Sequence, residues 1–251
     1  MAFRQKPATH FDGLNMRAMI LAAGRGERMR PLTDTLPKPL IPVGGKPLIV
    51  WHIENLARAG VKDIVINHAW LGKKIEDYLG NGSHWGLSIQ YSPEASALET
   101  AGGIATAMPM LGNQPFVVVN GDVWCDWDFK QSFRIADQLS DTTPSFKSNR
   151  KLAWLLMIDN PEHHPNGDFV LQQDGLISDE GASRLTFSGI GLYHPALFND
   201  TIAGQPAKLA PLLRSAMKSG SVLGAKHTGR WVDVGTPERL ASLNNEIEIR
   251  N

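Results

Sequence analysis

The chain has 251 residues, of which 42% are hydrophobic and 20% charged, with 25 basic and 25 acidic side chains. This composition is that of a soluble globular protein and excludes disordered and low-complexity classes. A net charge of zero provides no overall field for nucleic acid or an anionic membrane, so any anionic ligand must be held by a local cluster. The single Cys125 excludes an intrachain disulfide, and no apolar run reaches the roughly 18 to 20 residues of a membrane span. We therefore expect a cytoplasmic protein with neither nucleic-acid nor membrane partners.

The first 15 residues contain no apolar segment of the length found in signal peptides. A compact strand pattern begins at Met16. We expect residues 1–15 to be an N-terminal extension and residues 16–251 to form a single domain, because no independent hydrophobic pattern restarts further along the chain.

Strands and helices alternate through the first half of the chain. Short apolar runs predict strands, and apolar residues three or four positions apart predict helices. The expected order is strand 17–22, helix 48–59, strand 63–68, helix 71–79, strand 87–91, helix 102–110 and strand 115–120. This alternation implies βαβ crossovers, helices on both faces of a mainly parallel sheet, and ligands at the C-terminal ends of the strands.

The second half is less regular and predicts a mixed extension of the sheet. The expected elements are strands 152–159, 169–173, 186–193 and 221–227, with one helix over 209–219. The fold class is therefore α/β, with a mixed, mainly parallel sheet flanked by helices.

A glycine-rich basic loop directly follows the first strand. Gly24 and Gly26 let the backbone approach a ligand closely, which suits a polyphosphate. The cationic residues of this segment are Arg25, Arg28, Arg30 and Lys38. A dinucleotide fingerprint is disfavoured because Met29 stands where a small residue is needed, and a P-loop fails because Pro47 replaces the required Ser or Thr.

The pattern L-A-A-G-x-G-x-R-x-x-P-L-T over residues 21–33, followed by P-K-P-L over 37–40, resembles the signature of the sugar-1-phosphate nucleotidyltransferases. Enzymes of that family have a Rossmann-like α/β core and join a sugar 1-phosphate to a nucleoside triphosphate, releasing pyrophosphate. The resemblance implies that Arg28 and Lys38 are catalytic residues at the reacting phosphates. It also implies a nucleotide-binding set of Leu21, Ala22, Ala23, Gly24, Arg25, Gly26 and Glu27.

Residues 99–103 (E-T-A-G-G) resemble the second glycine-rich nucleotide loop of the family. The resemblance adds Thr100, Gly102 and Gly103 to the nucleotide-binding residues. Backbone groups of small residues could read the edge of a base, which leaves uracil and guanine undistinguished.

Two aspartates are candidates for a metal site. Asp122 follows a predicted strand at the ligand edge of the sheet, and Asp233 lies on an expected turn before a final helix. Carboxylates from separate segments suit Mg²⁺, which proteins bind through one or two carboxylates together with substrate phosphates. In the resembling family the matching aspartates hold the catalytic magnesium ion.

Other possible metal ligands are expected to have no such role. Asp126 and Asp128 follow Asp122, but no EF-hand loop surrounds them, so we expect solvated side chains. His163 and His164 are adjacent and do not share a face of a helix or strand, which favours ordinary loop residues.

The resemblance assigns the sugar to Asn120, Gly167, Ser188 and Gly189, and Lys208 is a further candidate for binding this substrate. Many members of the family carry a Glu-Lys-Pro element whose lysine grips the sugar phosphate, and residues 178–183 lack it. Lys208 and Arg184 are the candidates to replace that lysine and to pair with a carboxylate on the sugar.

Several further segments resemble a compact bacterial branch of the family that lacks a C-terminal β-helix domain. They are INHAWLG at 66–72, YSPE at 91–94, VNGDVW at 119–124, DNPEHH at 159–164, FSGI at 187–190 and KLAPLLR at 208–214. That branch makes UDP-N-acetylmuramic acid and pyrophosphate from UTP and N-acetylmuramic acid 1-phosphate in peptidoglycan recycling.

Two alternatives stay open. A mannose-1-phosphate guanylyltransferase is possible because the base-reading loops do not exclude guanine. A noncatalytic regulatory subunit that binds sugar nucleotides is the alternative of another class. The joint presence of Arg28, Lys38, Asp122 and Asp233 argues against it.

Overall fold

The computed structural model describes residues 16–140 and 150–249, so the extension expected over residues 1–15 lies outside the described part. One large sheet has the strand order β12-β8-β11-β6-β1-β4-β5. These strands are β1 (Arg17–Ala22), β4 (Asp63–His68), β5 (Ser88–Pro93), β6 (Phe116–Asn120), β8 (Ala153–Ile158), β11 (Arg184–Tyr193) and β12 (Val222–Lys226). Two short strands, β9 (Phe169–Leu171) and β10 (Ile177–Ser178), extend the sheet from the start of β11.

The sheet is mainly parallel, as predicted. Strand β1 is parallel to β4 and β6, β4 to β5, and β8 to β12. Strand β11 is antiparallel to both of its long neighbours, β6 and β8, and is the one strand of the seven-strand row that runs the opposite way. A single reversed strand is a common addition to a doubly wound sheet.

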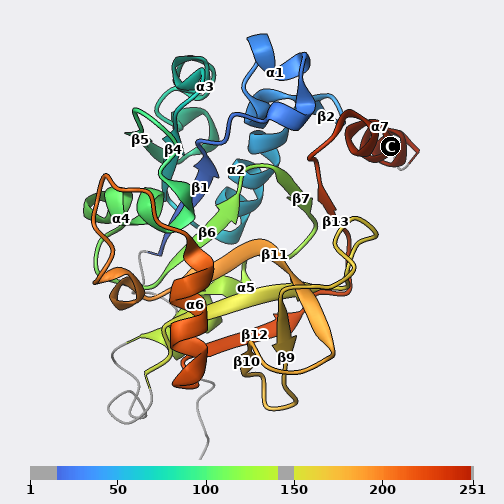
Figure 1. Cartoon of the computed structure of the whole chain (residues 1–251). Helices are drawn as coiled ribbons and strands as arrows, with labels where there is room; N and C mark the ends of the chain where they lie inside the picture. Colours follow the sequence, from blue (N-terminus) through green and yellow to red (C-terminus); the bar gives the residue numbers. More distant parts are fainter. Residues whose placement is uncertain (1–15, 141–149, 250–251) are drawn as a thin grey trace, which may run out of the picture.

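Helices cover both faces of the sheet, because every second side chain of a strand points to the same face. In β1, Ala18 and Ile20 pack in the cluster formed with α2, α3 and α5, whereas Met19 packs in the cluster formed with α4 and α6. Figure 1 shows α6 in front of the sheet and α2 behind it. The helices are α2 (Leu48–Ala59), α3 (Gly72–Leu79), α4 (Glu99–Leu111), α5 (Gln131–Leu139) and α6 (Leu209–Lys218). None of the helices in the described part of the chain combines the length and apolarity needed to cross a bilayer.

A smaller layer lies beside the sheet and carries part of the site. It consists of a two-stranded ladder of β7 and β13, the β2–β3 hairpin and helix α7. Their bounds are β7 (Val123–Cys125), β13 (Trp231–Asp233), β2 (Pro42–Val43), β3 (Lys46–Pro47) and α7 (Pro237–Glu248). Their shared cluster contains Val43, Leu48, Trp124, Val234, Leu243 and Ile247. The Thr236 hydroxyl caps α7 by accepting a hydrogen bond from the amide of Arg239, so α7 begins just after β13.

The predicted elements all occur, with ends that differ by at most three residues. The largest difference is α4, which begins at Glu99 and not at Gly102, with Glu99 itself at a φ of 59°. Helix α5 and the ladder of β7 and β13 were not predicted. The remaining short elements are η1 (Glu27–Met29), α1 (Leu32–Thr35), η2 (Lys38–Leu40), η3 (Ser83–Trp85) and η5 (Pro195–Phe198).

Candidate active site

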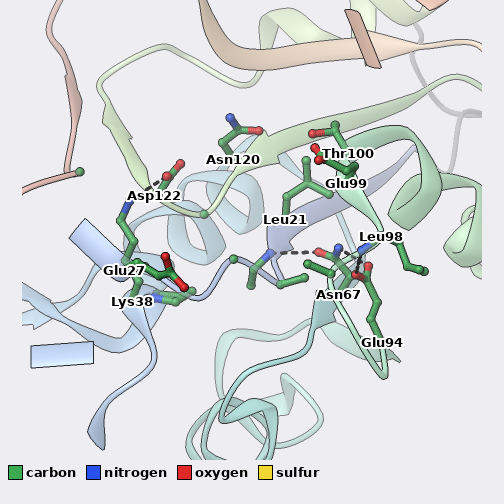
Figure 2. A pocket seen from close by; sticks show the side chains of 18 of the residues that line it. Leu21, Glu27, Lys38, Asn67, Glu94, Leu98, Glu99, Thr100, Asn120 and Asp122 are labelled. Atoms are coloured by element: carbon green, nitrogen blue, oxygen red, sulfur yellow. Dashed lines mark hydrogen bonds and ion pairs between the residues drawn. The ribbon is translucent and has the colours of Figure 1, made fainter. Parts of the chain in front are cut away.

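A cleft of about 610 Å³ opens at the C-terminal ends of β1, β4 and β6, the edge at which ligands of parallel sheets bind. Of the residues expected to bind nucleotide or phosphate, those in its lining are Leu21, Ala22, Ala23, Gly24, Gly26, Glu27, Arg28, Lys38, Thr100, Asn120 and Asp122. Its other lining residues are Pro39, Asn67, Glu94, Ala97, Leu98, Glu99, Gly121 and Gly235. Figure 2 shows Lys38 and Asp122 at one end, Leu98, Glu94 and Asn67 at the other, and Leu21 between them. The cleft therefore suits an elongated ligand.

The glycine-rich loop turns sharply at Gly26, whose φ of 69° favours glycine. A Cβ at Gly26 would lie 3.0 Å from Thr33 Cγ2 and 3.1 Å from Lys38 Cβ. The Thr33 hydroxyl donates a 2.8 Å hydrogen bond to the Gly26 carbonyl. Gly24 has open space where a Cβ would stand. Arg25 is absent from the lining of this cleft, because its guanidinium lies over the Trp70 ring at 4.4 Å from the centroid.

Lys38 and Asp122 form an ion pair at one end of the cleft, with 2.7 Å between Lys38 Nζ and Asp122 Oδ2 (Figure 2). The lysine side chain is only 8% exposed, whereas the aspartate is 40% exposed. Lys38 begins the short η2 turn between Pro37 and Pro39, which restricts the backbone on both sides. A positive charge is thus held in a fixed position beside a carboxylate that a ligand can reach.

A second cleft of about 380 Å³ adjoins the first. Arg28, Asn120 and Asp122 line both clefts, so the two meet at these three residues. The other lining residues of the second cleft are Val123, His163, His164, Thr186, Phe187, Ser188, Gly189, Trp231 and Asp233. Two ligands, one in each cleft, would bring their reactive groups together beside Arg28 and Asp122.

The ladder of β7 and β13 brings the two candidate metal ligands to the same cleft. Asp233 pairs with Val123 in the ladder, and the amide of Val234 donates a 2.9 Å hydrogen bond to the Asp122 carbonyl. Asp233 Oδ2 accepts a hydrogen bond from Arg239 Nη1 at 2.9 Å. Its other oxygen, Oδ1, is buried and has no hydrogen-bond partner among the described residues.

These residues fit a magnesium ion. A buried carboxylate oxygen without a hydrogen-bond partner is costly, and carboxylate oxygens are the ligands that Mg²⁺ prefers. Gly235 keeps the surroundings of Asp233 free of a side chain, because a Cβ there would lie 2.8 Å from Asp233 Oδ1. The same Cβ would lie 3.0 Å from Arg28 Nη2 and 2.4 Å from Arg239 Nη2. Asp122 and Asp233 together can therefore hold a cation where the two clefts meet.

The opposite end of the first cleft rests on a buried hydrogen-bond network that the sequence did not indicate. Asn67 Oδ1 accepts from the amide of Ala22 at 2.9 Å, and Asn67 Nδ2 donates to Glu94 Oε1 at 2.7 Å (Figure 2). Glu94 Oε2 accepts from the amide of Leu98 at 2.9 Å. The network joins the glycine-rich loop to the loop before α4. The next residue after Leu98 is Glu99, which lies in the wall of the cleft in a left-handed conformation.

Replacing Glu94 by alanine should destabilise the fold and weaken nucleotide binding more than it slows turnover. The change leaves the Asn67 amide and the Leu98 N–H buried without a partner, at about 1 to 3 kcal/mol for each group. Urea denaturation and the KM for the nucleotide check this prediction, with exposed Glu248→Ala as the matched control. An unchanged free energy of unfolding together with an unchanged KM would contradict the assigned role of Glu94.

Three of the glycines that were expected to contact a ligand line neither of the two clefts. A Cβ at Gly102 would lie 2.2 Å from the Gln205 carbonyl oxygen, and one at Gly103 would lie 2.7 Å from Glu94 Oε1. These two glycines are absent from the lining of both clefts and allow close packing beneath the loop. Gly167, at a φ of 61°, packs on Asn160 and is likewise absent from both linings.

The two cations expected at the sugar lie outside the second cleft. Lys208 is exposed at the N-terminus of α6. Arg184 is occupied elsewhere, since its guanidinium donates to the carbonyls of Asp168 and Asp179 and forms an ion pair with the Asp179 carboxylate. Ser188 and Gly189, in contrast, line the second cleft.

His163 and His164, expected to be ordinary loop residues, both lie in the wall of the second cleft. His163 Nε2 is 2.8 Å from Arg239 Nη1 and 3.5 Å from Asp233 Oδ2. Partial burial is the main cause that lowers the pKa of His163, and the nearby Arg239 guanidinium lowers it further. His164 Nε2 is 3.1 Å from Asp168 Oδ1. Adjacent residues reach one cleft here because they lie in a loop, where the alternation of a strand does not apply.

A third group of possible metal ligands, Cys125, Asp126 and His227, lies beyond the other end of the β7–β13 ladder. Asp126 Oδ1 accepts from His227 Nε2 at 2.8 Å and from the amide of Arg230 at 2.9 Å. Burial raises the pKa of the Cys125 thiol to about 12, so the thiolate needed for metal binding is disfavoured. Asp128 caps a turn through a hydrogen bond from the amide of Lys130. Asp126 and Asp128 thus make structural hydrogen bonds.

The sheet, the glycine-rich loop after β1 and the joined clefts define a nucleotidyltransferase. Residues 17–150 match the nucleotidyl transferase family, and the chain belongs to that family of enzymes. The resemblance drawn from the sequence motifs is thereby confirmed.

The chain is 57% identical over 228 residues to the N-acetylmuramate alpha-1-phosphate uridylyltransferase of Neisseria meningitidis serogroup B, covering 90% of this chain and 95% of that protein. It is 33% identical to the protein of the same name from Caulobacter vibrioides, covering 88% and 92% of the two chains. A mannose-1-phosphate guanyltransferase of Aspergillus oryzae is 31% identical, covering 90% of this chain and 63% of that protein.

A solved structure supports the fold. A protein described as a glucose-1-phosphate thymidylyltransferase from Bacillus anthracis superposes with a TM-score of 0.78 over 94% of this chain and 96% of that one. The two sequences are 24% identical, so this likeness speaks for the architecture alone.

Proposed function

We propose that this enzyme makes UDP-N-acetylmuramic acid and pyrophosphate from UTP and N-acetylmuramic acid 1-phosphate, as a step of peptidoglycan recycling in the cytoplasm. The observation that carries the reaction type is the meeting of two clefts at Arg28, Asn120 and Asp122. The choice of substrates is supported by the 57% identity to the Neisseria enzyme over nearly the full length of both chains. A single cysteine, buried and free, suits a reducing compartment.

In this proposal UTP occupies the first cleft. Its base lies toward Leu98 and Thr100, and its triphosphate lies along the glycine-rich loop toward Lys38. The sugar 1-phosphate occupies the second cleft, beside Ser188 and Gly189. This arrangement directs the sugar phosphate at the α-phosphorus of the nucleotide.

The bond-making step needs no general base. A phosphate monoester has a second pKa of about 6 and is largely dianionic near neutral pH, so its oxygen is already a nucleophile. That oxygen forms a bond to the α-phosphorus while the bond from the α-phosphorus to the oxygen of the β-phosphate breaks, and pyrophosphate leaves with the electron pair. Arg28 and Lys38 reduce the repulsion between the two anions and stabilise the departing charge.

Asp122 and Asp233 would hold Mg²⁺, which supplies neutralisation of phosphate charge when it is bound. Lys38 and Arg239 keep these two carboxylates oriented in the absence of substrate, through the 2.7 Å ion pair to Asp122 and the 2.9 Å hydrogen bond to Asp233. The buried Oδ1 of Asp233 is left for the cation.

Pyrophosphate release over a matrix of four nucleoside triphosphates and several sugar 1-phosphates, with and without Mg²⁺, tests the proposal. We expect the pair of UTP and N-acetylmuramic acid 1-phosphate to give the highest kcat/KM, at least about tenfold above UTP with N-acetylglucosamine 1-phosphate. The highest value for GTP with mannose 1-phosphate would instead identify a guanylyltransferase. No release with any pair in the presence of Mg²⁺ would contradict the proposed reaction.

A further inference from the structure

The sugar of the proposed reaction differs from N-acetylglucosamine by a lactyl ether that ends in a carboxylate. A carboxylate that leaves water for a cleft needs hydrogen-bond donors or a cation there. Lys208 and Arg184 are absent from the second cleft, as described above. Among the residues that line it, the side chains able to carry positive charge are Arg28, His163 and His164. Arg28 lines both clefts and is assigned to the reacting phosphates, whereas His163 and His164 line the second cleft alone, which leaves the two histidines as candidates for a group of the sugar.

The hydrogen bonds of His163 determine which of its ring nitrogens can donate. Arg239 Nη1 lies 2.8 Å from His163 Nε2, and a guanidinium can only donate hydrogen bonds. His163 Nε2 is therefore the acceptor, and the imidazole proton resides on Nδ1. Nδ1 makes no hydrogen bond to any of the residues 16–140 and 150–249. The imidazole thus offers a donor that a ligand can use, with the Arg239 cation directly behind it.

His164 differs from its neighbour in this respect. Its Nε2 is 3.1 Å from Asp168 Oδ1, and a carboxylate can only accept, so the proton of the neutral ring resides on Nε2. Asp168 is itself held in place, because its Oδ2 accepts a 2.8 Å hydrogen bond from the amide of Phe187. The Nδ1 of neutral His164 is an acceptor and does not suit a carboxylate. Of the two histidines, His163 is the donor.

We propose that His163, backed by Arg239, binds the lactyl carboxylate of the sugar and so selects N-acetylmuramic acid 1-phosphate over sugars without that group. The inference rests on the proposed function. It assigns to His163 the role that the sequence suggested for Lys208 or Arg184. Because the Arg239 cation is also anchored by Asp233, the carboxylate site and the candidate metal site share one support.

Two substitutions distinguish the roles of the two ring nitrogens of His163. In His163→Gln the side-chain amide reaches the position of Nε2 and retains a partner for Arg239, but no donor remains at the position of Nδ1. In His163→Asn the amide nitrogen lies near the position of Nδ1 and retains the donor. The matched control is His84→Gln. His84 is exposed and lies in the η3 turn, which precedes β5.

The measurement is kcat/KM with UTP for N-acetylmuramic acid 1-phosphate and for N-acetylglucosamine 1-phosphate, and the readout is their ratio. We expect His163→Gln to lower this ratio by about tenfold or more, chiefly through the KM of the muramic substrate. His163→Asn should preserve more of the ratio, and His84→Gln all of it. Calorimetric binding of the two sugar phosphates to the metal-free protein should show the same loss of discrimination in Kd.

The outcomes are distinguishable. An unchanged ratio in His163→Gln overturns the inference, and so does an equal loss with both sugars, which would mean that His163 holds the phosphate common to them. If the wild-type enzyme itself prefers a different sugar phosphate, the proposed function fails, and the assignment of His163 fails with it.

Discussion

Replacing Lys38 by methionine is expected to lower kcat/KM by about 10²- to 10³-fold, the loss typical of one preorganised electrostatic group. Methionine retains most of the aliphatic stem that packs on Gly26 and removes only the charge. Because the ammonium group is held almost fully buried beside Asp122, water cannot take over its role during turnover. Steady-state kinetics of pyrophosphate release, with circular dichroism to verify the fold, measures this effect.

Arg28→Ala should cause a loss of the same order, because Arg28 lines both clefts. Arg30→Ala is the control, since the Arg30 side chain forms an exposed 2.7 Å ion pair with Asp34 and is absent from both linings. We expect Arg30→Ala to change kcat/KM by less than about threefold. If Arg30→Ala were as damaging as Arg28→Ala, the assignment of the loop residues to the phosphates would be wrong.

Asp122→Asn and Asp233→Asn should each reduce kcat by on the order of 10² or more, because each removes one charge from the candidate magnesium site. The Asp233→Asn change also removes the charge that faces Arg239, so a thermal melt must accompany the kinetics. Chelation of the metal by EDTA should reproduce both losses in the wild-type protein. Titration with Mn²⁺ followed by electron paramagnetic resonance reports the binding of the cation separately from turnover.

The exposed Asp77, which pairs with Lys73 on the surface of α3, is the control for these variants, and Asp77→Asn should leave kcat and Mn²⁺ affinity unchanged. Near-normal turnover in a folded Asp122→Asn or Asp233→Asn variant at saturating Mg²⁺ would remove that residue from the metal site. Reduced turnover with normal Mn²⁺ affinity would give the aspartate a role toward substrate only.

The predictable part of this protein is local. The apolar runs of β1, β4 and β6 fill both faces of a buried sheet, and that burial is visible in the sequence as short runs of Val, Ile, Leu, Ala, Met and Phe. The alternation of strands and helices then determines a mainly parallel sheet and its ligand edge. The glycine-rich loop is local as well, because a tight turn and a concentration of cations are properties of adjacent residues.

Other elements have sequence patterns too weak to predict them. Strands β7 and β13 contain only three residues each, too few for a period of two to stand out, yet their pairing brings Asp122 and Asp233 together. Helix α4 begins three residues before the predicted Gly102, because its N-cap residue, Leu98, makes no side-chain capping hydrogen bond and the following Glu99 is left-handed, so the sequence carries no capping signal there.

The sequence by itself determined the fold class, the glycine-rich loop after β1 and the identity of the family, all of which depend on residues close together in the chain. Only the tertiary structure decided which side chains surround the second cleft. It brings His163 beside Arg239, 76 residues away, and leaves Lys208 on the surface. The physical reason is that the direction of a side chain in a loop is determined by its partners. When those partners come from other elements, neither the periodicity nor the composition of the sequence predicts them.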